Sequence, residues 1–259
     1  MFAVAEAYER QMGRWSRRLA PLFVEFIGIN DGDCVLDVGC GTGSLSSTIA
    51  KTTGAAKIIG VDPSAGFIKF ARTHNADPRV SFDIEDAQNL PYPDGVFDRC
   101  IASLIINFIP DAAKAAKEMR RVTKPGGVAA TCMWDNAGGM EMQEFFWDAA
   151  SALEPEAGQF RERNQRYGSR AALSSLWDAA GFANVEVKLL VIPLNFSSFD
   201  DLWLPYLEGQ GPGGAYLVSL SKERQEALRE KLRSNLLGGR PDGPFTLSGK
   251  AWAVRGKVP

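Results

Sequence analysis

Asp37-Val38-Gly39-Cys40-Gly41-Thr42-Gly43 is the part of this chain from which its architecture follows. It continues the short apolar run CVLDVG at 34–39, which predicts a buried strand. Glycines at alternate positions let the backbone turn sharply and approach a ligand without hindrance from Cβ atoms. A helix predicted over 43–52 begins directly behind them and offers free N–H groups. The stretch therefore predicts a strand, a ligand-binding turn and a helix in succession.

The alternation of strands and helices continues through the first half of the chain. Strands are predicted at 57–62, 80–84, 97–104 and 127–134, and helices at 64–74 and 111–123. Lys124-Pro125-Gly126-Gly127 predicts a turn into the last of these strands. Nearly uninterrupted apolar strands that alternate with helices predict a parallel sheet covered on both faces. Such sheets bind ligands beyond the carboxyl ends of their strands, so the functional site is expected there.

Length and composition exclude several classes of protein. The chain has 259 residues, of which 45% are hydrophobic and 23% charged, as is typical of a globular protein. A formal net charge of −2 argues against a nucleic-acid partner and against binding to an anionic membrane. No apolar run reaches the roughly 18 residues of a membrane span. The four cysteines lack zinc spacing, so we predict no metal site and a reducing, cytoplasmic compartment.

Acidic residues end three strands that are expected to be neighbours in the sheet. Asp37, Asp62 and Asp86 would therefore face one crevice. Each alone is equally well interpreted as a solvated turn residue, but three in register favour a ligand that carries positive charge and hydroxyl groups. A dinucleotide fingerprint needs a third glycine where this chain has Ser44, and Asp37 would repel a pyrophosphate. An NAD-dependent oxidoreductase is therefore the less favoured interpretation.

Four motifs in order carry a resemblance to a known family. DVGCGTGSL, VDPS, EDAQNLPYPDGVFD and the KPGG turn resemble the class I S-adenosylmethionine-dependent methyltransferases, in particular the ubiquinone-biosynthesis type, over roughly residues 30–135. The resemblance implies a Rossmann-like α/β fold. Its sheet would have seven mostly parallel strands in the order 3-2-1-4-5-7-6, with helices on both faces and helical lid insertions.

The resemblance also implies a role for individual residues. Gly39, Gly41 and Gly43 would line the methionine portion of S-adenosylmethionine, with Asp37 near its ammonium group. Asp62 would bind the ribose hydroxyls, and Pro63 would lie beside the adenine. Asp86 and the backbone of Ala87 would bind the edge of the adenine. Ser103 and Asn107 would lie near the sulfonium and the acceptor. From the N-terminal stretch, Arg14 or Arg17 would meet the cofactor's carboxylate and Tyr8 or Met12 its methionine portion. The alternative interpretation is that this stretch forms a basic helix face exposed to solvent.

The second half of the chain predicts the end of the sheet and two long excursions. Residues 173–182 predict a helix, and 184–194 and 245–256 predict the last two strands. We expect a single domain over 1–259, with an N-terminal helical cover (1–30), a cofactor-binding half (31–134) and substrate-lid insertions at 135–168 and 197–240. Five aromatic residues would line an acceptor pocket or form the excursions' own core: Phe145, Phe146, Trp147, Trp203 and Tyr206.

The expected reaction is in-line methyl transfer to a small-molecule acceptor in a closed crevice. Positioning alone can supply much of the acceleration, so a base is needed only when the acceptor must lose a proton. Candidates for that base are Tyr206, Asp200 and Glu208, whereas the single histidine, His74, is interpreted as a helix-end residue. A non-catalytic protein that binds the cofactor and regulates a partner remains an alternative, because the motifs report cofactor binding rather than turnover.

Overall fold

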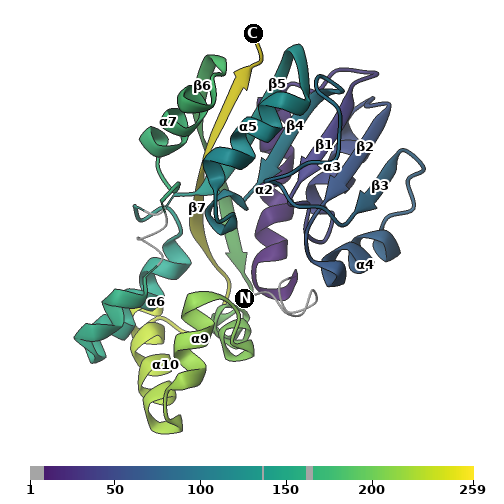
Figure 1. Ribbon diagram of the computed structural model, residues 1–259. Coiled ribbons are helices and arrows are strands. Elements are labelled where there is room, and N and C mark those ends of the chain that lie inside the picture. The colour runs from purple at the N-terminus through teal and green to yellow at the C-terminus, as the bar shows by residue number, and fades with distance from the viewer. Residues whose placement is uncertain (1–8, 136, 162–165) are drawn as a thin grey trace. The chain divides into compact units, whose positions relative to one another are not determined.

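The computed structural model describes residues 9–135, 137–161 and 166–259 (Figure 1). Within these residues seven strands form one sheet in the order β3-β2-β1-β4-β5-β7-β6. The strands are β1 (Cys34–Val38), β2 (Lys57–Val61), β3 (Val80–Asp83), β4 (Phe97–Ser103), β5 (Thr123–Trp134), β6 (Ala183–Phe196) and β7 (Phe245–Lys257). The predicted Rossmann-like α/β fold and its strand order are confirmed.

The direction of the strands follows from their connections. β1 to β5 pair in parallel, since a helix or a long connection returns the chain to the same end of the sheet each time. β7 pairs antiparallel with β5, with Ala130 opposite Arg255. β1 and β2 are buried at their last four positions, as their apolar runs predicted. The carboxyl ends of β1, β2 and β3 consequently meet at one edge.

The start of β5 differs from the prediction. The strand begins at Thr123, not at residue 127, and its first residue pairs with Phe97 across a register irregularity in β4. Gly126 adopts a φ of +77°, and its N–H donates to the carbonyl of Val258. The predicted turn therefore forms an irregular start of β5, because Val258, just after β7, accepts the hydrogen bond from the Gly126 N–H.

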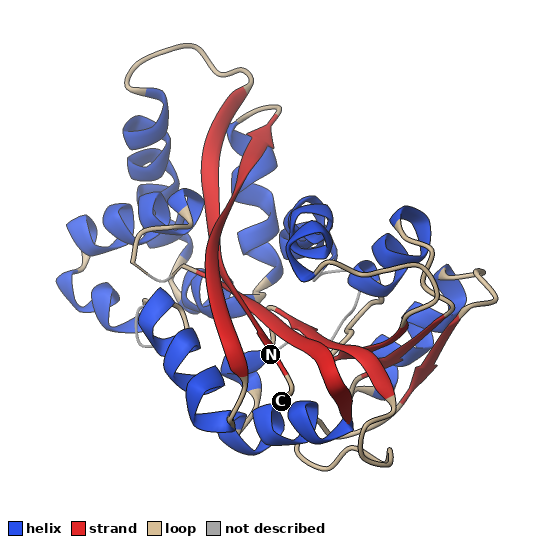
Figure 2. Ribbon diagram, turned by 90° about the horizontal axis from the view of Figure 1, so that it is seen from above, coloured by secondary structure: helices blue, strands red, loops and turns tan. Residues whose placement is uncertain are grey.

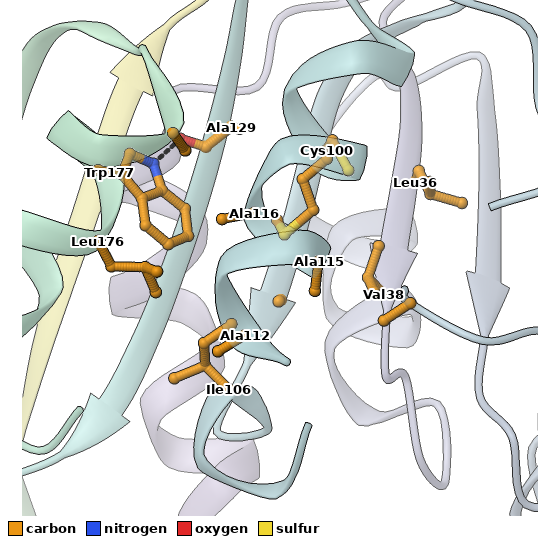
Figure 3. Packing of buried hydrophobic residues seen from close by; sticks show 14 of the residues in the cluster. Leu36, Val38, Cys100, Ile106, Ala112, Ala115, Ala116, Ala129, Leu176 and Trp177 are labelled. Atoms are coloured by element: carbon orange, nitrogen blue, oxygen red, sulfur yellow. Dashed lines mark hydrogen bonds between the residues drawn. The ribbon is translucent and has the colours of Figure 1, made fainter. Parts of the chain in front are cut away.

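Helices cover both faces of the sheet (Figures 1 and 2). They are α2 (Arg14–Ile27), α3 (Ser44–Thr52), α4 (Ala65–His74), α5 (Ala112–Val122) and α7 (Arg170–Ala180). Side chains alternate along β1, so Leu36 and Val38 pack in the same cluster as α5 and α7, whereas Asp37 meets Ser46 of α3. Figure 3 shows the small alanine side chains of α5 against the sheet, and the Trp177 indole donating to the carbonyl of Ala129 at 3.1 Å. One face of the sheet is thus an apolar core, and the other carries a buried acid.

The described residues divide into two compact units. One contains residues 15–135, 166–190 and 251–259, and the other comprises the described parts of 1–14, 136–165 and 191–250. The second unit is mainly helical: η1 (Glu9–Gly13), α6 (Glu141–Leu153), η3 (Pro155–Phe160), α8 (Phe199–Trp203), η5 (Leu204–Glu208), α9 (Gly211–Ser219) and α10 (Lys222–Leu237). No helix among the residues described is long and apolar enough to cross a membrane.

The helical unit has a core of its own, formed by both excursions. α6 packs against α10 and η3, and α9 packs against η5. The Phe146 ring stacks on Tyr206 with 4.4 Å between centroids, and Trp147 lies 5.5 Å from Tyr216. Phe146, Trp147, Trp203 and Tyr206 are all at most 3% exposed. Most of the aromatic residues proposed for the acceptor pocket therefore belong to the interior of this unit.

Candidate functional site

Asp37 is a carboxylate buried inside the sheet near the end of β1. It is 1% exposed, because strands flank it on either side and α3 packs against it. Its Oδ2 accepts a hydrogen bond of 2.6 Å from Ser46 Oγ, whereas its Oδ1 has no hydrogen-bond partner among the described residues. Burial raises the pKa of Asp37 to about 7; the Ser46 hydrogen bonds oppose this rise and the charge of Asp62 adds to it. An ionised Asp37 would consequently lack a compensating donor at Oδ1 among the described residues.

The glycine loop between β1 and α3 has left-handed backbone at all three glycines. The φ angles of Gly39, Gly41 and Gly43 are +68°, +54° and +81°. A Cβ on Gly39 would lie 2.7 Å from Cγ1 of Ile105, so this position is closed by its neighbour. A Cβ on Gly41 would meet nothing within 4 Å. The loop is therefore anchored at its start and open at Gly41, where a ligand can approach the backbone.

Asp62 connects the end of β2 to this loop. Its two oxygens accept backbone hydrogen bonds from Gly41 (3.1 Å) and from Ser64 (2.8 Å). The residue is 8% exposed, and burial raises the pKa of its carboxyl against the effect of these two donors. Pro63 beside it is exposed. Each carboxylate oxygen keeps a second lone pair, so Asp62 can still accept from hydroxyl groups of a ligand.

The loop after β3 carries the third acid. Asp86 is exposed and accepts from the backbone N–H of Gln88 at 2.9 Å and from its side-chain amide at 3.2 Å. These hydrogen bonds lower the pKa of Asp86. Ala87 is buried behind it. Ile84, which we did not predict as a site residue, is 51% exposed one residue beyond β3 and offers an apolar surface at the same edge.

Ser103 and Asn107 lie at and just beyond the end of β4. The Ser103 hydroxyl is 3.4 Å from Cys132 Sγ, and Asn107, in the turn η2 (Ile106–Phe108), accepts from the backbone N–H of Tyr167 at 2.8 Å. Between them Leu104 has a φ of +63°. Leucine rarely adopts this backbone conformation, and such strain costs about 1–3 kcal/mol. The sequence contains no signal for it, yet it turns the chain so that Ile105 packs on Gly39.

The sheet brings the cofactor-site residues of its own unit to one edge. Val38 pairs with Val61, and Val61 pairs with Asp83, so the residues that follow these three strands lie side by side. Asp37, the glycine loop, Asp62 and the Asp86 loop all extend from this edge. Among the described residues, no group of three or more histidines, cysteines or acids is arranged to hold a metal ion.

The other proposed site residues belong to the helical unit or lie outside the described residues. Arg14 donates to the Asp201 carboxylate at 2.6 Å and to the Asp201 carbonyl at 3.0 Å. Asp200 forms an ion pair of 3.0 Å with Arg229. The Tyr206 hydroxyl donates to the carbonyl of Met142 at 3.4 Å, and Glu208 is exposed. Tyr8 lies outside the described residues.

Comparison with known proteins agrees with this geometry. Residues 36–131 match the sequence model of a family described as a methyltransferase domain. The chain is 38% identical over 114 residues to the methyltransferase GfsG of Streptomyces halstedii, which covers 42% of this chain and 41% of that protein. It is 36% identical over 115 residues to the ubiquinone/menaquinone biosynthesis C-methyltransferase UbiE of Bdellovibrio bacteriovorus, which covers 44% of this chain and 47% of that protein. The matched segments thus make up less than half of either relative.

A solved structure extends the likeness to nearly the whole fold. Phosphoethanolamine N-methyltransferase 2 of Haemonchus contortus, solved with S-adenosylmethionine, superposes with a TM-score of 0.59 at 22% identity and covers 98% of this chain and 57% of that one. At this identity the likeness establishes the fold alone. The strand order is that of the Rossmann-like fold shared with solved methyltransferases, and within it residues 36–131, which include the glycine loop, match the methyltransferase domain family.

Proposed function

We propose that this protein binds S-adenosylmethionine at the carboxyl edge of β1, β2 and β3 and transfers its methyl group to a small-molecule acceptor. The observation that carries the proposal is the buried Asp37 carboxylate, whose Oδ1 receives no hydrogen bond from the residues that the structure describes. A buried carboxylate oxygen without a donor is costly, so its presence favours a cationic ligand group. The open backbone at Gly41 and the second acid, Asp62, at the next strand end support the same ligand.

The residues present fit the chemistry of this cofactor. Asp37 would accept from its ammonium group, the three glycines would line its methionine portion, and Asp62 would accept from its ribose hydroxyls. Asp86, the backbone of Ala87 and Pro63 would hold the adenine, beside the exposed apolar side chain of Ile84. Ser103 and Asn107, at the end of β4, would lie near the sulfonium and the acceptor. An NAD pyrophosphate would instead meet two acids at this edge.

Bound S-adenosylmethionine supplies a methyl group that is already activated for displacement. The residues of the chain then need to bind, orient and exclude water, and orientation alone can contribute about 7–11 kcal/mol. Two of the candidate bases are engaged, since Asp200 pairs with Arg229 and Tyr206 donates to a carbonyl. We therefore propose an acceptor with an intrinsically good nucleophile, such as an amine, an enolate-like carbon or a thiol. Tyr206→Phe keeps the stacked ring, and unchanged turnover is expected.

Further support for a small acceptor comes from the composition and from the relatives. The net charge of −2 does not favour nucleic acid, and one relative is named for ubiquinone and menaquinone biosynthesis. We propose that the helical unit built from the two excursions forms the lid over the acceptor. The four cysteines are free thiols, three of them buried, which supports a cytoplasmic location.

Thermal unfolding with S-adenosylmethionine, S-adenosylhomocysteine or NAD tests the cofactor assignment. A ligand at a hundred times its dissociation constant stabilises a protein by about 2.7 kcal/mol, or roughly 5–10 °C for a chain of this size. A shift with the first two ligands and none with NAD is expected. A shift with NAD alone, or with none of the three, would overturn the proposal. Binding without transfer to any small acceptor would instead favour a regulatory protein.

A further inference from the structure

Ser46 and Asp37 form a buried pair on the α3 side of the sheet. Ser46 is fully buried in the first turn of α3 and directs its hydroxyl at Asp37 Oδ2, 2.6 Å away. That hydrogen bond fixes the plane of the carboxylate. It occupies one oxygen and leaves Oδ1 as the acceptor without a partner. The pair therefore presents one defined carboxylate oxygen rather than a freely rotating group.

Among the described residues, no cation acts on Asp37 to balance its ionised form. Asp37 pairs with Gly60 on β2 and with Ile101 on β4, both uncharged. Within the described part of the chain the charge that acts on Asp37 is that of Asp62, which has the same sign. Burial also raises the pKa of three nearby thiols, and the negative charge of Asp37 adds to this rise: Cys40, Cys100 and Cys132. Without a ligand, this environment favours a protonated Asp37.

We infer that Ser46 is a positioning residue for the cofactor: it holds the Asp37 carboxylate so that Oδ1 receives a cationic group of the ligand, which displaces the proton of Asp37. This inference rests on the proposed function, because it takes the ligand's ammonium group as that cation. Asp37 binds the cation only as a carboxylate, and Ser46 stabilises the carboxylate by donating to it. Cofactor affinity is therefore linked to proton release from Asp37.

The linkage gives a measurable pH profile. With the pKa of Asp37 at about 7, the fraction of free protein able to bind falls roughly tenfold between pH 8 and pH 6. In Ser46→Ala the carboxylate loses a charge-assisted donor, which is expected to raise its protonation constant about tenfold. The variant's affinity deficit should therefore be about tenfold larger at pH 6 than at pH 9. The ligand's own amino group also titrates, but it cancels in the ratio of variant to wild type at each pH.

Calorimetric binding of S-adenosylhomocysteine between pH 6 and pH 9 tests the inference. The proteins compared are wild type, Ser46→Ala and Asp37→Asn. Ser47→Ala is the matched control, because Ser47 lies next to Ser46 in the same helix but its hydroxyl accepts from Asn75. We expect the Ser46→Ala to wild-type ratio of dissociation constants to fall as the pH rises, and the Ser47→Ala ratio to stay constant. Asp37→Asn should bind more weakly and lose the acid limb of the profile.

Two outcomes separate the inference from the proposed function. A Ser46→Ala deficit that is equal at every pH would mean that Ser46 has only a structural role, and would overturn the inference while leaving the cofactor assignment intact. The same holds if Asp37→Asn keeps the acid limb. Absence of S-adenosylhomocysteine binding to the wild type at any pH would overturn the proposed function itself. A second measurement, proton release on binding in buffers of different ionisation enthalpy, should show release at pH 6 for the wild type and none attributable to residue 37 in Asp37→Asn.

Discussion

Replacing Asp37 with asparagine is expected to stabilise the ligand-free protein, by an amount that grows as the pH rises from about 4 to about 7. Burial raises the pKa of Asp37 from 3.8 to about 7, so the folded state between these values holds a proton that the unfolded chain has lost. The stability that this proton contributes at acid pH is lost as the pH rises to about 7. Each tenfold change in the protonation constant is worth 1.36 kcal/mol, so the full effect is roughly 4 kcal/mol. Asparagine is neutral throughout and avoids this loss.

Thermal unfolding of Asp37→Asn and wild type at pH 5 and pH 8 measures the effect. At pH 5, about one unit above the pKa of the unfolded chain, the variant should already gain some stability, but less than half of the full effect. At pH 8 the variant should unfold roughly 8–16 °C higher, since roughly 4 kcal/mol is at stake and 1 kcal/mol corresponds to roughly 2–4 °C in a protein of this size. Asp86→Asn is the matched control, because its hydrogen bonds lower the pKa of Asp86 and the variant should be no more stable than wild type at pH 8. An equal gain for Asp37→Asn at both pH values would refute the reasoning.

Three further changes test other parts of the site. Gly39→Ala adds a Cβ 2.7 Å from the Ile105 side chain at a residue with a left-handed φ. Thermal unfolding should therefore show a free energy of unfolding that is lower by about 1–3 kcal/mol, and an unchanged value would disprove this packing. Asp62→Asn should weaken S-adenosylhomocysteine binding about tenfold or more in calorimetry with an unchanged circular dichroism spectrum, and equal affinity would remove Asp62 from the site. Arg14→Ala should cost less than about 1 kcal/mol in urea unfolding, because its ion pair with Asp201 is partly exposed, and should leave S-adenosylhomocysteine affinity unchanged. A tenfold loss of that affinity would instead assign Arg14 to the cofactor.

The sequence predicted the sheet well because its strands are almost wholly apolar. β1 and β2 end within one residue of their predicted bounds, and the antiparallel end of the sheet follows the order that the resemblance implied. His74 ends α4, as predicted, and its ring nitrogen lies 2.9 Å from the carbonyl of Phe70. The bounds of these strands and of α4 were predictable because they depend on hydrophobic periodicity and turn residues within each segment.

Contacts between distant segments and unusual backbone angles were not predictable in the same way. No pattern in the chain indicates that Leu104 is left-handed, since leucine is not a turn residue. The pairing of Ser46 with Asp37 depends on how closely α3 packs on β1, and the burial that shifts the pKa of Asp37 depends on both neighbouring strands. The start of β5 was missed because its unusual glycine is stabilised by a carbonyl from the far end of the chain.

Hydrogen–deuterium exchange with and without S-adenosylhomocysteine, read by peptide mass spectrometry, tests the central claim most directly. The account predicts slower exchange in peptides that contain the glycine loop at 39–46, the end of β2 at 62–68 and the loop at 84–90, because these segments form the proposed binding edge. At a ligand concentration near the wild-type dissociation constant, Asp62→Asn should lose most of this protection. Protection that appears only in other segments, or is equally strong in Asp62→Asn, would contradict a cofactor site at the carboxyl ends of β1, β2 and β3.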